Sequence, residues 1–274
     1  MDHNLKQLIE NALAEDIGPG DITTETTIPD DATSTAEMLA KQDLVLAGLD
    51  VAGEVFHYLD PRVQFTPLAK DGDKIKAGTV LARVSGKTRV LLTGERVALN
   101  FLQHLSGIAT LTAKYVEKLK GLKVEVLDTR KTLPGLRHLE KHAVRMGGGK
   151  NHRMGLYDMV LIKDNHIKAA GGITKAVEAA RKKAGQLKIE VETRNLEEAR
   201  EALAAKVDII MLDNMPVETM REAVNLIAGR TLVEASGNVT LDTIRTIAET
   251  GVNFISTGSI THSAPAADIS MKIK

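Results

Sequence analysis

Six short apolar runs in the second half of the chain constrain its fold more than any other feature. They are Val124–Leu127, Met159–Ile162, Leu187–Glu192, Val207–Leu212, Thr231–Ala235 and Phe254–Thr257. The later runs are separated by stretches with helical periodicity: ITKAVEAARKKAG, NLEEAREALAA, PVETMREAVNLIAG and TLDTIRTIAETG. Apolar strands that alternate with helices predict a parallel sheet covered on both faces. The repeat of roughly 20 to 35 residues fits a β/α barrel or a doubly wound sheet.

The first part of the chain has a different pattern, β-rich and interrupted by glycines from about Thr33 to Thr93. We expect paired strands in STAEMLAKQDLVLAG, further strands in RVQFTPL, TVLARVSG and TRVLLTG, and a helix in LDVAGEVFHYLD. The spacing of apolar residues from Leu5 to Leu13 predicts an amphipathic opening helix. A second helix is predicted in ERVALNFLQHLSGIATLTAKYVEKLKG, with a break at Gly107.

Composition excludes several classes of protein. The chain has no Cys, which rules out a disulfide framework and a thiolate metal site. The segment MDHNLKQLIENALAEDIG lacks the apolar core of a signal peptide, and no run is apolar enough to span a bilayer, so we expect a cytoplasmic protein. A formal net charge of +0 and an aromatic content of 3% argue against a dedicated nucleic-acid binder.

One stretch, from Thr129 to Lys168, is strongly cationic. It holds nine Lys or Arg, three Asp or Glu, and four of the eight His. Because the whole chain is neutral, this excess is local, and it predicts a site for a polyanionic ligand. The alternative is a solvated helix face with spare lysines.

Polar residues follow every predicted strand. The clusters are Asp128-Thr129-Arg130-Lys131, Lys163-Asp164-Asn165-His166, Glu192-Thr193-Arg194, Asp213-Asn214, Ser236-Gly237-Asn238 and Gly258-Ser259. In a parallel barrel the carboxyl ends of all strands open on one face, where active sites form. Turn formers and helix caps also place polar residues there, and Asn195, Asn214 and Thr240 fit caps. Lys163, Glu192 and Asp213, by contrast, directly end apolar runs, and capping does not call for a Lys.

The last two clusters, SGN and TGS, combine small residues with the expected start of a helix. Small side chains let backbone N–H groups approach an anion closely. In β/α barrels the loops after the last strands are the usual phosphate site. We therefore expect a phosphate there.

The block DTRKTLPGLRHLEKHAVRMGGGKNHRMGLYDMVLIKDNHI closely resembles the signature of the quinolinate phosphoribosyltransferase family. EDIGPGDITTE, ERVALNFLQHLSGIAT, IEVETRNLEEA, DIIMLDNM, VEASGNVTLDTI and GVNFISTGSITHS resemble that family too, in its order and over nearly the whole chain.

This resemblance implies an α/β protein of two domains. The first, over residues 1–106, is an N-terminal α/β open-faced sandwich, to which a C-terminal strand at about 267–274 returns. The second, over residues 107–266, is an incomplete, seven-stranded α/β barrel, so a seventh strand is expected between Arg130 and Asp158. The resemblance also implies a homodimer or a multiple of dimers.

The activity that the resemblance implies is a pentosyl transfer. The phosphoribosyl group of phosphoribosyl pyrophosphate (PRPP) moves to quinolinate with decarboxylation, giving nicotinate mononucleotide, pyrophosphate and CO₂, a step of de novo NAD biosynthesis. The implied cofactor is Mg²⁺. No nucleophilic residue and no organic cofactor are needed, which suits a chain without Cys.

The resemblance assigns Arg96, Arg130 and Arg153 to quinolinate, with Thr129, Lys131 and His152 beside them and Arg96 contributed across the dimer interface. Planar guanidinium groups suit this role because they bind carboxylates in bidentate fashion. From the residues alone, a surface ion pair with Glu95 also accounts for Arg96, and a satisfied structural histidine accounts for His152.

Lys131, Lys163, Glu192 and Asp213 form the implied catalytic set. Glu192 and Asp213 are expected to engage the ribose hydroxyls and Mg²⁺, directly or through water or substrate, and Lys163 a substrate phosphate or carboxylate. The implied phosphate cradle is Ser236, Gly237, Asn238, Gly258 and Ser259.

Three alternatives remain open. His138 and His142 have a spacing that suits a metal on one helix face, although surface or packing roles are favoured. The protein is alternatively a phosphoribosyltransferase for nicotinate, against which the three arginines argue, or a barrel that binds a nucleotide or phosphosugar without catalysis.

Overall fold

The computed structural model describes residues 3–274, which divide into two compact units. The first unit holds the chain up to Leu111 together with residues 134–148 and 264–274, and the second holds residues 112–133 and 149–263. The segment 134–148, which lies inside the expected barrel domain, thus groups with the N-terminal part of the chain.

The first unit is built on an antiparallel sheet of order β12-β1-β5-β3 and a separate pair, β2-β4. Its strands are β1 (Thr33–Ala40), β2 (Leu44–Val45), β3 (Gln64–Pro67), β4 (Lys74–Ile75), β5 (Val80–Lys87) and β12 (Ile269–Ile273). Its helices include α1 (His3–Ile17), α2 (Ile22–Thr27), α3 (Leu49–Leu59) and α5 (Arg137–Met146). The two strands expected to pair within STAEMLAKQDLVLAG, β1 and β2, do not pair with each other, so that prediction is wrong.

Side chains alternate along β1 as one covered sheet face requires. Ala36, Met38 and Ala40 are buried on one side. On the other side Glu37 accepts a hydrogen bond from Arg83 of β5, across the pair of strands, at 3.1 Å. Period-two alternation of this kind is typical of an antiparallel sheet with one packed face.

Helix α4 (Thr88–Lys118) runs for 31 residues without a break and crosses the division between the two units. Two predictions are therefore wrong: TRVLLTG begins this helix instead of forming a strand, and Gly107 does not interrupt it. A short apolar run does not distinguish a strand from a buried helical turn, which explains the first error. Gly107 is required for another reason, because a Cβ there would clash with the carbonyl oxygen of Pro265.

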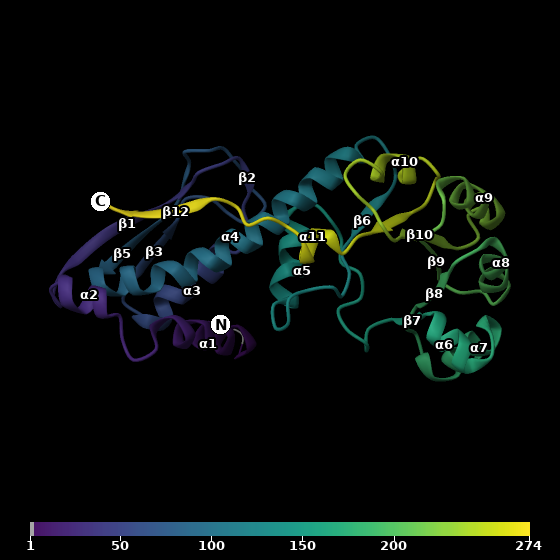
Figure 1. The fold of residues 1–274 in the computed structure, drawn as a ribbon, viewed down its shortest axis with the longest axis horizontal. Helices are drawn as coiled ribbons and strands as arrows, with labels where there is room; N and C mark the ends of the chain where they lie inside the picture. The colour runs from purple at the N-terminus through teal and green to yellow at the C-terminus, as the bar shows by residue number, and fades with distance from the viewer. Residues whose placement is uncertain (1–2) are drawn as a thin grey trace. The chain divides into compact units, whose positions relative to one another are not determined.

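The second unit contains a parallel sheet of order β6-β11-β10-β9-β8-β7. Its strands are β6 (Glu125–Leu127), β7 (Val160–Ile162), β8 (Ile189–Thr193), β9 (Ile209–Asp213), β10 (Leu232–Ser236) and β11 (Phe254–Ser256). The connecting helices are α6 (Asp164–Ala170), α7 (Ile173–Ala184), α8 (Leu196–Ala204), α9 (Val217–Ile227), α10 (Ile244–Ala248) and α11 (Ser259–His262). Figure 1 shows α7, α8 and α9 along the outer side of β7 to β10. The predicted α/β class and all six predicted strands are confirmed.

The seventh strand expected between Arg130 and Asp158 is reduced to one contact. Lys150 forms an isolated parallel bridge with Leu127 of β6, and the described residues contain no longer pairing in that interval. The sheet of this unit therefore has six strands. Among the described residues, no helix has the length and apolar character needed to cross a bilayer.

Candidate active site

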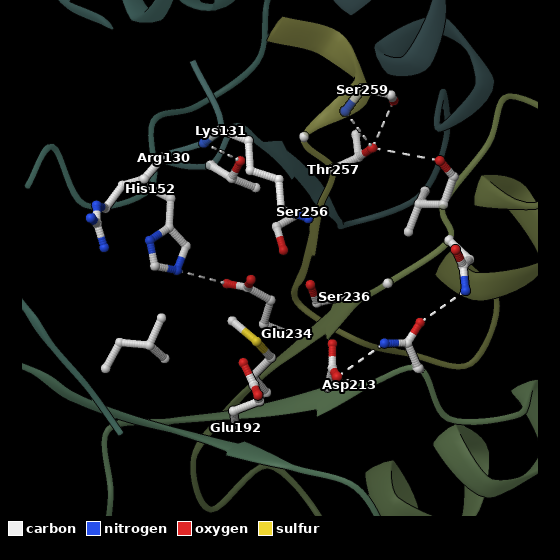
Figure 2. A pocket seen from close by; sticks show the side chains of 18 of the residues that line it. Arg130, Lys131, His152, Glu192, Asp213, Glu234, Ser236, Ser256, Thr257 and Ser259 are labelled. Carbon is white, nitrogen blue, oxygen red and sulfur yellow. Dashed lines mark hydrogen bonds and ion pairs between the residues drawn. The ribbon is translucent and has the colours of Figure 1, made fainter. Parts of the chain in front are cut away.

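The carboxyl ends of the six parallel strands surround a cavity of about 770 Å³. Alternate residues of a strand point to the same side, so four of the strands supply the cavity with residues two apart. These pairs are Leu161 and Lys163 at the end of β7, Met211 and Asp213 on β9, Glu234 and Ser236 on β10, and Ser256 and Gly258 at the end of β11. Figure 2 shows Asp213, Glu234 and Ser236 among the side chains that line the cavity.

Two cationic segments, residues 129–131 and 152–153, reach the same cavity because buried Asp128 connects them. Asp128, at the end of β6, is fully buried and accepts a hydrogen bond from the His152 amide at 2.9 Å and from the Asn151 side chain at 2.5 Å. Arg130 and Arg153 therefore line the same cavity. Burial lowers the pKa of Arg153, and the nearby positive charge of Arg130 lowers it further. Two guanidinium groups close enough to disfavour each other's charge are suited to a dianion.

Lys163 and Glu192 form the closest ion pair of the cavity. Lys163 Nζ donates to Glu192 Oε2 at 2.6 Å, and the Glu192 side chain is 12% exposed whereas that of Lys163 is 44% exposed. Lys163 is also the residue before α6, so its backbone is fixed by the start of that helix. The ammonium group is thereby held at the rim of the cavity beside a largely buried carboxylate.

Asp213, at the end of β9, is oriented by amides of the next loop. Asn214 donates to Asp213 Oδ2 at 3.0 Å and accepts from Asn238 at 3.0 Å. Gly237 lies between these groups, with φ +97°, and a Cβ there would clash with the Asn214 side chain. The glycine of the SGN cluster is therefore needed to let the two asparagines meet. Asn214, expected as a possible helix cap, instead orients Asp213, whereas Asn195 caps α8 as predicted.

The loop after β11 is ordered by hydroxyl groups. Ser259 Oγ lies 2.8 Å from Thr257 Oγ1 and 3.1 Å from the hydroxyl of Tyr115, which is a residue of α4. Thr257 and Ser259 line the cavity with Gly258 (Figure 2). Thr261 of α11 donates to the Lys131 carbonyl at 2.8 Å, which connects this loop to the first cationic segment.

His152, which lines the cavity with Glu234, also contacts Glu190, and both glutamates are buried. His152 Nε2 is 2.9 Å from Glu190 Oε2 and 3.5 Å from Glu234 Oε2. Burial lowers the pKa of His152 and the neighbouring carboxylates of Glu190 and Glu234 raise it, so the three groups titrate together.

The other ring nitrogen of His152, Nδ1, accepts a hydrogen bond, which disfavours a proton on that nitrogen. The Arg153 amide donates to His152 Nδ1 at 2.8 Å, and a nitrogen that accepts this hydrogen bond carries no hydrogen of its own. In this geometry the ring carries a single hydrogen, on Nε2, which faces Glu190. Burial and the charge of Glu234 raise the pKa of Glu190 to about 7.

With one exception, the predicted site residues line this single cavity. They are Thr129, Arg130, Lys131, His152, Arg153, Lys163, Glu192, Asp213, Ser236, Gly237, Asn238, Gly258 and Ser259. The exception is Arg96, which lies exposed on α4 in the first unit. It forms no ion pair with Glu95 within the described residues, although its charge lowers the pKa of that carboxyl against the larger, raising effect of burial.

Sequence reasoning missed the acidic layer beneath the site. Glu190 and Glu234 lie two residues before Glu192 and Ser236 in strands β8 and β10. The alternation of side chains along a strand could have predicted these glutamates, because a strand that presents Glu192 to the cavity presents Glu190 to the same side.

Two groups of residues have the chemistry of metal ligands. Glu192 and Asp213 offer carboxylate oxygens at the cavity, which suits Mg²⁺ with its preference for oxygen ligands and substrate phosphates. His152, Glu190 and Glu234 place possible ligand atoms within 4.8 Å of one another. His142, in contrast, bonds Asp71 at 2.9 Å, and His138 is exposed, so the two do not face a common metal position.

The fold and the cavity define an α/β enzyme that binds anionic substrates at the carboxyl ends of parallel strands. Comparison with known proteins narrows this class. The model of the quinolinate phosphoribosyl transferase C-terminal domain matches residues 108–272, and the model of its N-terminal domain matches residues 21–106. The chain belongs to the quinolinate phosphoribosyltransferase family.

Individual relatives agree along nearly the full length. A probable nicotinate-nucleotide pyrophosphorylase (carboxylating) of Synechocystis is 50% identical over 269 residues, covering 97% of this chain and 91% of the relative. A similarly named protein of Bacillus subtilis is 47% identical, covering 100% and 95%. The crystal structure of NadC from Streptococcus pyogenes has a TM-score of 0.96 at 45% identity and covers 100% of this chain and 98% of its own.

Proposed function

We propose that this protein transfers the phosphoribosyl group of PRPP to quinolinate and releases CO₂, forming nicotinate mononucleotide for de novo NAD biosynthesis. The observation that carries the proposal is the convergence of Arg130, Lys131, Arg153 and Lys163 on one cavity that also contains Glu192 and Asp213. Both substrates are anionic, and the reacting sugar carbon becomes cationic, so such a reaction needs both signs of charge close together. The chain is thus a pentosyltransferase of its family.

The two guanidinium groups suit the pyridine diacid. Quinolinate carries adjacent carboxylates, and Arg130 and Arg153 are close enough for their charges to interact. Each planar fork matches one carboxylate in bidentate fashion. Thr129, Lys131 and His152 lie beside them at the cavity wall. We assign this side of the cavity to quinolinate.

The neighbouring loops of the cavity suit PRPP. The loops after β10 and β11 provide Ser236, Gly237, Asn238, Gly258 and Ser259, whose small or short side chains let a phosphate approach the main chain. Glu192 and Asp213 lie between these loops and Lys163 and are assigned to the ribose hydroxyls. Their negative charge stabilises the sugar as its bond to pyrophosphate breaks.

The reaction then proceeds by positioning and electrostatics. The pyridine nitrogen forms a bond to C1 of the ribose while the bond from C1 to the pyrophosphate oxygen breaks. The positively charged ring accepts the electron pair left at the neighbouring carbon when its carboxylate departs as CO₂, and that carbon then takes up a proton. No step requires a nucleophilic side chain.

Mg²⁺ is proposed as the cofactor, held by Glu192 and Asp213 directly or through water or substrate oxygens. When bound it would neutralise the charge of the leaving pyrophosphate. Full turnover after exhaustive chelation would contradict this assignment.

The decisive experiment uses quinolinate labelled in the carboxylate that is lost. We expect labelled CO₂ to be released only when PRPP, Mg²⁺ and the protein are all present, in step with nicotinate mononucleotide. Substantial turnover of nicotinate without turnover of quinolinate would instead assign the protein to a monoacid substrate. A homodimer in which Arg96 enters the partner's site, and a location in the cytoplasm, remain predictions.

A further inference from the structure

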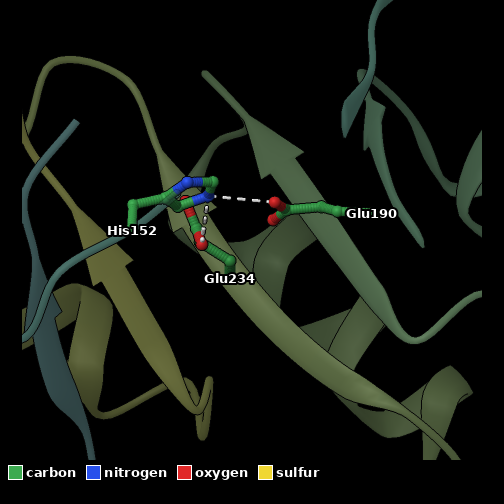
Figure 3. A group of neighbouring side chains, drawn as sticks. All are labelled: His152, Glu190 and Glu234. Atoms are coloured by element: carbon green, nitrogen blue, oxygen red, sulfur yellow. Dashed lines mark hydrogen bonds and ion pairs between the residues drawn. The ribbon is translucent and has the colours of Figure 1, made fainter. Parts of the chain in front are cut away.

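The imidazole of His152 has a protein partner at each ring nitrogen. Nε2 faces Glu190 at 2.9 Å and Glu234 at 3.5 Å, and Nδ1 accepts the Arg153 amide at 2.8 Å. Figure 3 shows both glutamates approaching the same ring nitrogen, Nε2. The His152 amide, in turn, donates to Asp128 at 2.9 Å. This residue is therefore held at its backbone and at both polar atoms of its side chain.

Such an arrangement limits what His152 offers to a substrate. A neutral imidazole has one N–H and one acceptor nitrogen, and here both are used inside the protein. The part of the ring left for the cavity is its C–H edge. His152 is thus poorly suited to bind a carboxylate by a hydrogen bond, although it lines the cavity.

The same geometry argues against a metal ion in this cluster. An imidazole that binds a metal through Nε2 carries its hydrogen on Nδ1 and donates it to a neighbouring acceptor. His152 Nδ1 is itself the acceptor of the Arg153 amide. A metal at Nε2 would require this hydrogen bond to break.

We infer that Glu190 is a positioning residue for the diacid site: its hydrogen bond fixes the His152 ring, and the ring fixes the main chain from which Arg153 extends. The inference rests on the proposed function. The Arg153 side chain is held independently at its far end, where Nη1 donates to the Met159 carbonyl at 3.2 Å. The hydrogen bond from the Arg153 amide to His152 Nδ1 and the hydrogen bond from Arg153 Nη1 to the Met159 carbonyl together position the guanidinium group.

The first test separates the acceptor role of Glu190 from its bulk. Glu190→Met has a similar length and no strong acceptor, whereas Glu190→Gln keeps an acceptor oxygen. We expect Glu190→Met to raise the KM for quinolinate about tenfold and Glu190→Gln to stay within about threefold of the wild type. The KM for PRPP should change by less than about twofold in both variants, because other strands build the phosphate loops.

The matched control is Glu222→Met, which removes an exposed glutamate on α9 and should leave both KM values unchanged. A folded Glu190→Met protein with the wild-type KM for quinolinate would overturn the inference. So would an equal rise in both KM values, because a loosened fold has no reason to affect one substrate alone. Thermal unfolding of each variant shows whether it is folded.

A second measurement needs only the wild-type protein and does not depend on activity. Long-range ¹H–¹⁵N spectra of histidine-labelled protein, with His152 assigned by its loss in His152→Asn, report which ring nitrogen carries the hydrogen. We expect a hydrogen on Nε2 and none on Nδ1. A hydrogen on Nδ1, or exchange between the two tautomers, would contradict the positioning role. A wild-type protein without quinolinate turnover would reject the proposed function, while this spectrum still decides the geometry of the cluster.

Discussion

Buried acids organise this cationic site at the scale of single residues. Asp128, Glu190 and Glu234 are all fully buried, and each lies next to the segment that carries His152 and Arg153. An uncompensated buried carboxylate is costly, so each of these acids favours a conformation in which a donor reaches it. The acids thereby draw the cationic segments into one place, where the positive groups alone would repel one another.

Arg130 is expected to be indispensable for quinolinate turnover. Replacement by Ala removes a bidentate partner of one carboxylate, and we expect kcat/KM for quinolinate to fall by at least about a hundredfold. Arg130→Lys should recover little of this, because an ammonium group lacks the planar fork. Steady-state kinetics and circular dichroism measure activity and folding together. Exposed Arg200→Ala is the control, and a folded Arg130→Ala protein with most of its activity would exclude Arg130 from the site.

Tyr115 is expected to act on PRPP through the hydroxyl network of the β11 loop. It is 4% exposed, and its hydroxyl lies 3.1 Å from Ser259 Oγ. Tyr115→Phe keeps the packed ring and removes that contact, so we expect the KM for PRPP to rise a few fold, about 1 kcal/mol. The KM for quinolinate should not change. Equal effects on the two substrates in steady-state assays would show that Tyr115 only supports the fold.

Among the elements, α4 depends on a close approach by the C-terminal segment. Ala267 donates its amide to the Gln103 carbonyl at 2.9 Å, and Gln103 donates to the Ile269 carbonyl at 2.7 Å. Gly107 lies one turn further along the helix, where a Cβ would clash with Pro265. The glycine in this helix therefore allows the segment before β12 to pass against it.

Gly107→Ala should accordingly destabilise the protein despite the better helix propensity of Ala. Overpacking against backbone costs about 1–3 kcal/mol, whereas the gain in propensity is about 1 kcal/mol. We expect a lower free energy of unfolding in urea, with a net loss of up to about 2 kcal/mol. Lys114→Ala, at an exposed position of the same helix, should change it by less than about 0.5 kcal/mol. A Gly107→Ala protein as stable as the wild type would show that the segment moves aside at no cost.

A second element, α3, depends on Asp71. Asp71 accepts the amides of Gly48 and Leu49 at 2.8 and 3.1 Å, at the start of the helix, and the His142 side chain of α5 at 2.9 Å. Burial raises the pKa of Asp71, but these hydrogen bonds outweigh it and leave that pKa below its ordinary value of 3.8. A carboxyl whose pKa is lowered by folding stabilises the native state above its unfolded pKa and ceases to do so as the pH falls through the folded value.

Asp71→Asn should therefore cost about 1–2 kcal/mol at neutral pH. Below the ordinary carboxyl pKa of 3.8 the wild type loses the same contribution, so the two unfolding free energies should converge as the pH falls. Denaturant titrations from neutral to acid pH measure this, with exposed Asp31→Asn as the control. A constant difference across the whole range would refute the role of the charge.

Elements with a strong pattern could be predicted from the sequence, and those that depend on tertiary contacts could not. The six parallel strands are continuous apolar runs between helices, and Lys163 and Asp213 were found because they end such runs. The start of α4 was missed because TRVLLTG has the residues of a buried strand and of a helical turn alike. Glu190 and Glu234 were missed because an acid inside a strand is stable only through a partner, here His152, which lies far away in the sequence.

At the scale of the whole molecule, the cavity residues come from one unit of the chain. Arg130, Arg153 and Lys163 belong to the second unit and Arg96 to the first. Arg96 is exposed on α4 and is not engaged by Glu95 in an ion pair within the described residues. If it completes the site of a second copy, as proposed, then each active site is made by two chains.

Mixing two inactive variants tests this directly. In a dimer of one Arg96→Ala chain and one Lys163→Ala chain, one site contains both defects and the other contains neither. Random exchange makes half of the dimers mixed, so a 1:1 mixture should recover about one quarter of the wild-type activity. The matched control pairs Arg130→Ala with Lys163→Ala, whose defects lie in the same unit of each chain, so every site keeps one defect. Recovery in the first mixture alone would place Arg96 in the partner's active site. No recovery after verified subunit exchange would show that Arg96 does not contribute to the partner's site.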